Sequence, residues 1–275
     1  MGAPGEGVRR SGGVRVSARH RLQVELEDAS IDVMVDGLGP LVVLLPSSLR
    51  DSTDFDFLAT LLADRGYQVL RPQPRGMGQS SPPSPQMTLD TLANDVAGVI
   101  RHFAAGPAVV VGHAFGHWVA RVLDWRHPAC VRGVVMLGAA AREFPPGVAE
   151  QLAMASDTAL PDHVRLTALQ ACMFAPGNDP SSWLSGWYPQ WRTAYQQAGR
   201  TPPKDQWYGQ AHSPVLDLQG AQDVWRPRQT RMDVVQLLGD KAQVYEIQQA
   251  GHALVPEQPE AVANAILTWM AQLTV

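Results

Sequence analysis

Three short segments carry residues that could act together in nucleophilic catalysis. The first is GHAFG at positions 112–116, the second is a turn that ends at Asp223, and the third is a loop that contains His252. A carboxylate that orients an imidazole and an imidazole that takes a proton together activate a nucleophile. The nucleophile itself would sit at the centre of the first segment, where Ala114 has only a methyl group.

The segment around Ala114 is expected to join a buried strand to a helix. The continuous apolar residues at 108–111 are typical of a strand that is covered on both faces, and a helical pattern starts directly after the segment. Such a junction holds its central residue in a strained backbone conformation. Strand and helix can approach closely only if small residues lie two positions to either side, and Gly112 and Gly116 meet that need.

The rest of the chain predicts strands that alternate with helices. Apolar patterns indicate strands at 22–26, 31–35, 41–45, 66–70, 108–111, 134–137 and 215–218. Helical patterns are found at 53–63, 89–103, 115–125 and 259–270. The first two strands are expected to form an antiparallel hairpin, and the alternation predicts an α/β fold with a mainly parallel, doubly wound sheet.

One stretch interrupts this alternation. Residues 143–210 contain no strand-like run, although they hold nine of the nineteen aromatic residues of the chain. We therefore expect a core made of residues 19–142 and 211–275, with 143–210 as an inserted helical cap. Residues 1–18 are rich in Gly and Arg and are expected to form a disordered leader.

The order of the three segments, in this context, resembles the α/β-hydrolase superfamily, in its serine-hydrolase form with a helical cap. The resemblance covers nearly the whole chain from about Leu22 and implies the α/β-hydrolase fold. It implies that Ala114 occupies the nucleophile position, where Ser is usual, that His252 is the general base, and that Asp223 orients it. It also implies an oxyanion hole formed by two backbone N–H groups, one of them that of Phe115.

The loop that should supply the second N–H group departs from the superfamily pattern. Where His-Gly is common, this chain has PSSL at 46–49, so Ser48 is the expected donor. The alternative, that Ser47 and Ser48 only form a turn, remains open. The segment PRGMGQS at 74–80 resembles an Arg-Gly-X-Gly-X-Ser turn of the superfamily, but Gln73 stands where Asp is frequent, and we interpret it as structural.

Three interpretations of Ala114 remain open. The favoured one is that Ser belongs there, because the glycines and the Asp223/His252 pair are otherwise complete. A second is that Ala stands in place of an Asp nucleophile, as in an epoxide hydrolase or dehalogenase, although the loop at 46–49 lacks the usual His-Gly-X-Pro of that group. The third is that no nucleophile belongs there, so that His252 acts on water or an acidic C–H, or the protein is a non-catalytic binder.

The resulting functional prediction is a hydrolase that acts on an ester, a lactone or an activated C–C bond in a small, largely apolar molecule. Substrate contacts are expected from His113 and from the cap residues Trp183, Trp187 and Trp191, whose helical spacing suits core packing equally well. Asp217 lies within a predicted strand and is a minority alternative to the acid proposed above.

Composition and charge limit the remaining functions. A net charge of −4, with both signs spread along the chain, is not typical of a protein that binds nucleic acid or an anionic membrane. His113 and His117 have the spacing of metal ligands on a helix, but the turn between them spoils that geometry, so we predict no metal and no cofactor. No apolar run approaches the ~20 residues needed to cross a bilayer, which predicts a cytoplasmic protein, as a monomer or homodimer. Cys130 and Cys172 are expected to be free, buried thiols.

Overall fold

Eight strands form a single sheet within residues 19–273, the part of the chain that the computed structural model describes. The strands are β1 (His20–Glu25), β2 (Ser30–Asp36), β3 (Leu41–Leu45), β4 (Gln68–Pro72), β5 (Ala108–His113), β6 (Val131–Leu137), β7 (Val215–Gly220) and β8 (Ala242–Ile247). Their order across the sheet is β1-β2-β4-β3-β5-β6-β7-β8. The β1–β2 and β2–β4 pairs are antiparallel and all the others are parallel, so the fold is the predicted α/β one. The predicted leader at 1–18 lies outside the described residues.

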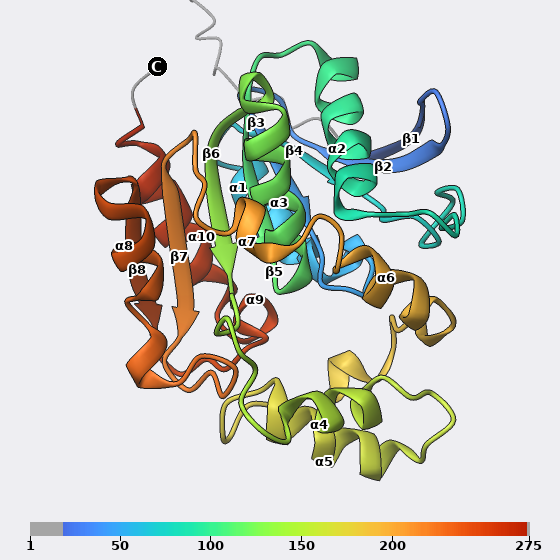
Figure 1. Cartoon of the computed structure of the whole chain (residues 1–275), viewed down its shortest axis with the longest axis vertical. Coiled ribbons are helices and arrows are strands. Elements are labelled where there is room, and N and C mark those ends of the chain that lie inside the picture. The colour runs from blue at the N-terminus through green and yellow to red at the C-terminus, as the bar shows by residue number, and fades with distance from the viewer. Residues whose placement is uncertain (1–18, 274–275) are drawn as a thin grey trace, which may run out of the picture.

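Helices cover both faces of this sheet (Figure 1). The helices are α1 (Asp56–Ala63), α2 (Leu89–Phe103), α3 (Phe115–Arg126), α4 (Val148–Ala155), α5 (Asp162–Cys172), α6 (Arg192–Ala198), α7 (Lys204–Trp207), α8 (Asp233–Leu238), α9 (Leu254–Glu257) and α10 (Pro259–Met270). Apolar residues of α2 and α3 belong to one core cluster, and those of α1 and α10 belong to a second. The doubly wound arrangement predicted from the alternating pattern is therefore present.

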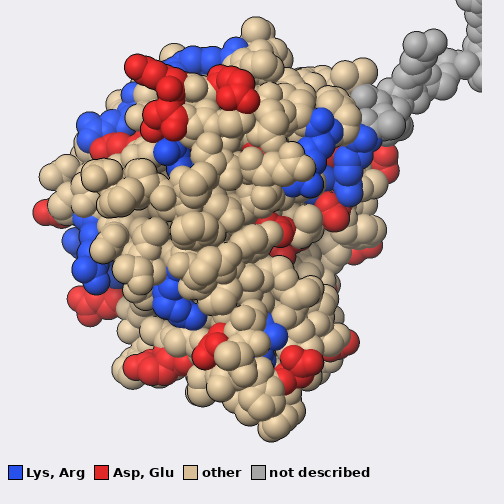
Figure 2. All heavy atoms as spheres, turned by 90° about the vertical axis from the view of Figure 1, so that its right-hand side faces the viewer, with Lys and Arg blue, Asp and Glu red and all other residues tan. Residues whose placement is uncertain are grey.

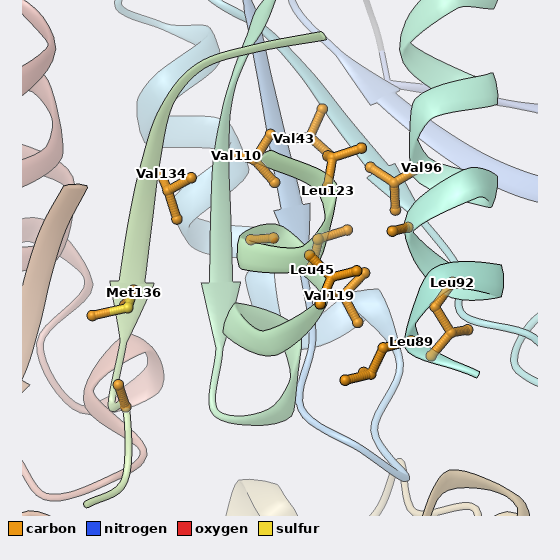
Figure 3. Close-up of a cluster of buried hydrophobic side chains, with 14 of the residues drawn as sticks. Val43, Leu45, Leu89, Leu92, Val96, Val110, Val119, Leu123, Val134 and Met136 are labelled. Carbon is orange, nitrogen blue, oxygen red and sulfur yellow. The ribbon is translucent and has the colours of Figure 1, made fainter. Parts of the chain in front are cut away.

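The two core clusters meet the sheet through alternate residues of the same strands. In β3, Val43 and Leu45 belong to the cluster under α2 and α3, whereas Val42 and Leu44 belong to the cluster under α1 and α10. Figure 3 shows the first cluster, where Val43 and Leu45 lie near Leu123 of α3. A strand that is buried on both faces needs apolar side chains at every position, which explains the unbroken apolar run at 41–45.

The segment between β6 and β7 contains helices α4 to α7 and, within the described residues, none of the strands of the sheet. Figure 1 shows α4 and α5 beyond the carboxyl ends of β6 and β7. The loop at 74–80 fastens this segment to the core, because the Trp191 indole donates to the Gly76 carbonyl (3.0 Å) and the Tyr195 hydroxyl donates to the Arg75 carbonyl (2.8 Å). Arg75 is itself held by Asp95, with two hydrogen bonds of 2.8 Å.

Three elements near the chain end were not predicted from the sequence: β8 and the short helices α8 and α9. β8 lies at the edge of the sheet, and four of its six residues are at least partly exposed, so its sequence AQVYEI carries little apolar signal. Helix α8 is only six residues long. The helix predicted at 53–63 begins as a 3₁₀ turn, Ser52–Phe55, before α1.

The surface and the cysteines agree with the composition. On the face in Figure 2, basic and acidic side chains are interspersed around a wide region that carries neither. Cys130 and Cys172 are free and buried, as predicted. Of the helices in residues 19–273, none combines the length and apolar character that a membrane span requires.

Candidate active site

The turn between β5 and α3 holds Ala114 in a backbone conformation that few residues other than glycine adopt. Its φ and ψ angles are 46° and −116°, and such a conformation costs of the order of 1–3 kcal/mol in a non-glycine residue. The Ala114 N–H donates to the Leu137 carbonyl of β6 (2.9 Å), which fixes the turn against the neighbouring strand. The sharp junction expected from the sequence is therefore present, at the carboxyl end of a central strand.

The two flanking glycines are required by close backbone contacts. A β-carbon on Gly112 would lie 2.3 Å from the Gly116 carbonyl oxygen. A β-carbon on Gly116 would lie 2.3 Å from the Leu45 carbonyl oxygen and 2.7 Å from that of Pro46. The helix thus packs directly against the end of β3, which brings the loop after β3 next to the turn.

His252 and Asp223 come together from two loops that follow β8 and β7. The Nδ1 atom of His252 lies 2.9 Å from Oδ2 of Asp223, and both residues are only 4% exposed. The other carboxylate oxygen of Asp223 accepts the Trp225 N–H (2.8 Å), which fixes its orientation. With Nδ1–H donating to the carboxylate, a neutral His252 has its acceptor lone pair on Nε2.

The alternative acid, Asp217, binds Gln219 and Arg226 rather than His252. It is fully buried in β7, where its Oδ2 accepts Gln219 Nε2 (2.7 Å) and Arg226 Nη2 (3.2 Å). Burial raises the pKa of Asp217 to about 6. Arg226 also donates to the carbonyls of Ala139 and Ala140, so this pair anchors the turn that carries Asp223.

His113 contacts the backbone of the loop that contains His252, called the histidine loop below. Its Nε2 lies 2.8 Å from the carbonyl oxygen of His252, and the side chain is 3% exposed. Burial, followed by the nearby His252, lowers the pKa of His113 to about 3, so the ring stays neutral and can donate to that carbonyl. His117 is buried on the first turn of α3, and burial lowers its pKa as well. In residues 19–273, no group of three or more His, Cys, Asp or Glu side chains is arranged to hold a metal ion.

A cavity of about 420 Å³ lies above the turn, and Ala114 and His252 both line it. Ser48 and Phe115 also line it, so the two residues expected to supply the oxyanion hole lie at the same cavity as the turn. Phe115 is the first residue of α3, where a backbone N–H has no partner within the helix. Apolar side chains of the segment 143–210, among them Phe144 and Leu152, form much of the remaining wall.

Only one of the three cap tryptophans singled out in the sequence reaches this cavity. Trp187 lines it, whereas Trp183, Trp191 and His113 are not among its lining residues, so a ligand contact by these three stays a prediction. Trp183 is 3% exposed and packs edge-on against His113, with ring centroids 5.9 Å apart. Trp191 packs against Gly76, where an added β-carbon would lie 2.5 Å from its Nε1. These side chains build the walls behind the cavity.

Arg50 holds the loop after β3, and sequence reasoning missed it. Its guanidinium forms an ion pair with Asp54, donates to the Ser185 carbonyl (2.7 Å) and lies 4.4 and 4.7 Å from the rings of Trp183 and Trp187. The Tyr188 N–H also donates to the Leu49 carbonyl (3.0 Å). Arg50 and Asp54 are four residues apart, but Arg50 lies before the 3₁₀ turn at Ser52–Phe55, so no local helical pattern indicates the pair.

Glu257 fastens the histidine loop, and it was also missed. One of its oxygens accepts the Gly251 N–H (2.8 Å), and the other accepts the Ala175 N–H (2.6 Å) and Asn178 Nδ2 (2.7 Å). It thus joins the residue before His252 to the inserted segment. No local sequence pattern indicates this role, because the partners are 6 to 82 residues away.

A model of the alpha/beta hydrolase family matches residues 42–265 of the chain. The protein belongs to the α/β-hydrolase family. The solved structure of an esterase from Exiguobacterium antarcticum is similar to this α/β-hydrolase with a TM-score of 0.77 and 19% sequence identity, over 91% of this chain and 99% of that one. At that identity the likeness shows the fold.

Curated relatives of this α/β-hydrolase match over shorter stretches. The 2-(acetamidomethylene)succinate hydrolase of Mesorhizobium japonicum is 30% identical over 42% of this chain. Epoxide hydrolase B of Mycobacterium tuberculosis is 38% identical over 39% of this chain. The matches span 41% and 31%, respectively, of the lengths of these two relatives.

The neutral, buried His113 predicts a pH dependence of stability. Its pKa is about 3 in the folded protein and about 6.5 when unperturbed, so between these values the unfolded chain binds a proton that the folded chain does not. Its contribution to the free energy of unfolding therefore falls as pH is lowered from about 6.5 to about 3. The variant His113→Gln should show a smaller loss than the parent over this range, measured by urea unfolding at each pH.

The control is His163→Gln, because His163 is exposed on α5. It should leave the pH dependence unchanged. Parallel stability curves for His113→Gln and the parent across this range would contradict the neutral state assigned to His113.

Proposed function

We propose that the protein is a hydrolase of an ester, a lactone or an activated C–C bond in a small, largely apolar molecule, and that position 114 is the nucleophile site, where Ser acts. The observation that carries the proposal is that Ala114, in its strained turn, lines the same cavity as His252, whose ring is held by Asp223. A base with a fixed tautomer beside a strained turn is the arrangement that activates a nucleophile.

The proposed reaction follows from the positions of these groups. With Ser at position 114, Nε2 of His252 takes the hydroxyl proton while the oxygen attacks the substrate carbonyl carbon. The N–H groups of Phe115 and Ser48 hold the negative charge on the carbonyl oxygen, and Asp223 stabilises the imidazolium. The imidazolium then gives its proton to the leaving group, and water releases the acyl product with His252 again as the base.

The relatives support a hydrolase but leave the substrate open. They carry the names of hydrolases of different compounds, and each match covers less than half of the relative. The walls support a largely apolar substrate, because aromatic rings from the core (Phe115, Trp118, Trp225) and from the inserted segment (Phe144, Trp187) surround the cavity. Specificity then depends on the shape of this cavity.

The variant Ala114→Ser tests the proposal. Alanine already adopts the strained conformation, and serine adds a single hydroxyl, so the variant should fold like the parent. Its turnover of a panel of small esters and lactones should exceed that of the Ala114 protein by several orders of magnitude, because nucleophile, base and oxyanion donors act as a unit.

The matched control adds His252→Ala to Ala114→Ser, which should abolish the gain. If the Ala114 protein already turns over its substrate in a His252-dependent way and Ser adds nothing, the proposed nucleophile is wrong and His252 acts on water or a carbon acid. If neither form acts on any compound but a small molecule binds in the cavity, the protein is a binder.

A second candidate is an epoxide hydrolase with an Asp nucleophile, which the 38% identity with epoxide hydrolase B over 109 residues favours. The variant Ala114→Asp should then open small epoxides such as styrene oxide, because a carboxylate at the turn can attack an epoxide carbon. Under the leading proposal, this variant shows no epoxide opening above that of the Ala114 protein, as measured by diol formation.

A further inference from the structure

Two arginines line the cavity without an acidic partner. Arg192 and Arg200 both belong to its lining, which contains no Asp or Glu side chain. Neither forms an ion pair with an acidic residue within residues 19–273. A guanidinium at an otherwise largely apolar wall therefore has positive charge that no protein group neutralises.

Most of the buried arginines of this chain have an acidic partner. Five are 3% exposed or less: Arg50, Arg71, Arg75 and Arg226 are paired with aspartates, and Arg121 donates to the backbone carbonyls of Tyr208 and Gln210 instead. Such pairing reduces the cost of removing a charge from water. Arg192 is half-buried, and its Nη2 donates to the Ser156 hydroxyl (2.7 Å) and to the Ala153 carbonyl (3.5 Å). Since a guanidinium has five N–H donors, most of those of Arg192 remain available.

The two arginines lie along one wall of the cavity. Arg192, Tyr195, Gln196, Gly199 and Arg200 all line it, with the spacing of one helix face. Arg192 is the first residue of α6, and Arg200 lies just beyond the helix end and is exposed. This places one cation within the wall and a second cation at its rim.

A third cation reinforces this positive side. The ammonium of Lys204 lies 4.1 Å from the ring centroid of Trp118 and 5.3 Å from that of Phe144, and both aromatic residues line the cavity. Asp223 lies behind His252, with Oδ2 on the imidazole and Oδ1 on the Trp225 N–H. The charges around the cavity therefore favour an anionic ligand.

We propose that the substrate carries a carboxylate, which Arg192 binds and Arg200 attracts at the rim. A carboxylate matches one guanidinium edge through two parallel hydrogen bonds. The inference specifies the substrate class of the proposed hydrolase and so rests on that function, but it can be tested by binding alone.

The test compares two ligands that differ at one group, which is a free carboxylate in one and its methyl ester in the other. Benzyl hydrogen glutarate has an ester, an aromatic ring for the apolar walls and a free carboxylate, and benzyl methyl glutarate has that carboxylate capped. Titration calorimetry with the Ala114 protein at low ionic strength should show that the acid binds at least about tenfold more tightly, as expected for a charge-assisted contact. The preference should shrink as salt is added.

Variants separate charge from packing. Arg192→Gln should remove most of the preference while the affinity for the diester stays within about twofold, and Arg192→Lys should retain part of it because the charge remains. Arg200→Gln should reduce the preference less. Arg228→Gln, at an exposed residue outside the cavity lining, is the matched control and should leave it unchanged.

Equal affinities for acid and diester, no saturable binding of either, or an equal loss of both in Arg192→Gln would overturn the carboxylate site. Turnover by Ala114→Ser distinguishes this failure from failure of the proposed function. Hydrolysis of both compounds at equal efficiency leaves the hydrolase and removes the carboxylate site. Selective binding of the acid without turnover of any ester leaves the carboxylate site and removes the hydrolase.

Discussion

The contact between the start of α3 and the end of β3 fixes the turn at Ala114 against the loop that carries Ser48. Gly116 leaves no room for a side chain, since a β-carbon there would lie 2.3 Å from the Leu45 carbonyl oxygen. This closeness brings the loop with Ser48 beside Phe115 and forces the strained conformation of Ala114. The strain is maintained because β5 lies at the centre of the sheet, with β3 on one side and β6 on the other.

Two side chains, Arg50 and Glu257, connect the loops of the site to the inserted segment. Arg50 links the loop after β3 to the tryptophans of the segment, and Glu257 links the histidine loop to residues 175 and 178. Moving either loop would leave the Arg50 guanidinium or the Glu257 carboxylate without its hydrogen-bond partners, which makes alternative arrangements costly. The loops that carry Ser48 and His252 therefore keep a fixed position relative to the cavity wall. A catalytic base and an oxyanion hole both need such fixed positions.

The sequence predicted most of the fold because its signals are local. Helices α2 and α10 have the predicted bounds, and Gly112 and Gly116 alone indicate the turn at Ala114. The sequence could also select Asp223 over Asp217, since the order and the loop context of the motifs favoured it, and the 2.9 Å contact with His252 agrees with that choice. The edge strand β8 was missed because its exposed side chains remove the apolar pattern.

Contacts between distant parts of the chain could not be predicted in this way. The helical spacing of Trp183, Trp187 and Trp191 says which residues share a face, but not whether that face meets Arg50, Gly76 or the cavity. The supporting roles of His113 and Glu257 depend on partners up to 139 residues away. The cationic wall formed by Arg192 and Arg200 is visible only once the segment is folded over the sheet.

The central claim is that position 114 is a nucleophile site served by His252. Labelling with a fluorophosphonate tests it without knowledge of the substrate, because the reagent reacts with an activated serine hydroxyl. Intact-mass and peptide analysis of Ala114→Ser should show one adduct at position 114, and the Ala114 protein and the Ala114→Ser/His252→Ala double variant should show none. No adduct on Ala114→Ser, or an adduct of equal rate in the double variant, would contradict the claim.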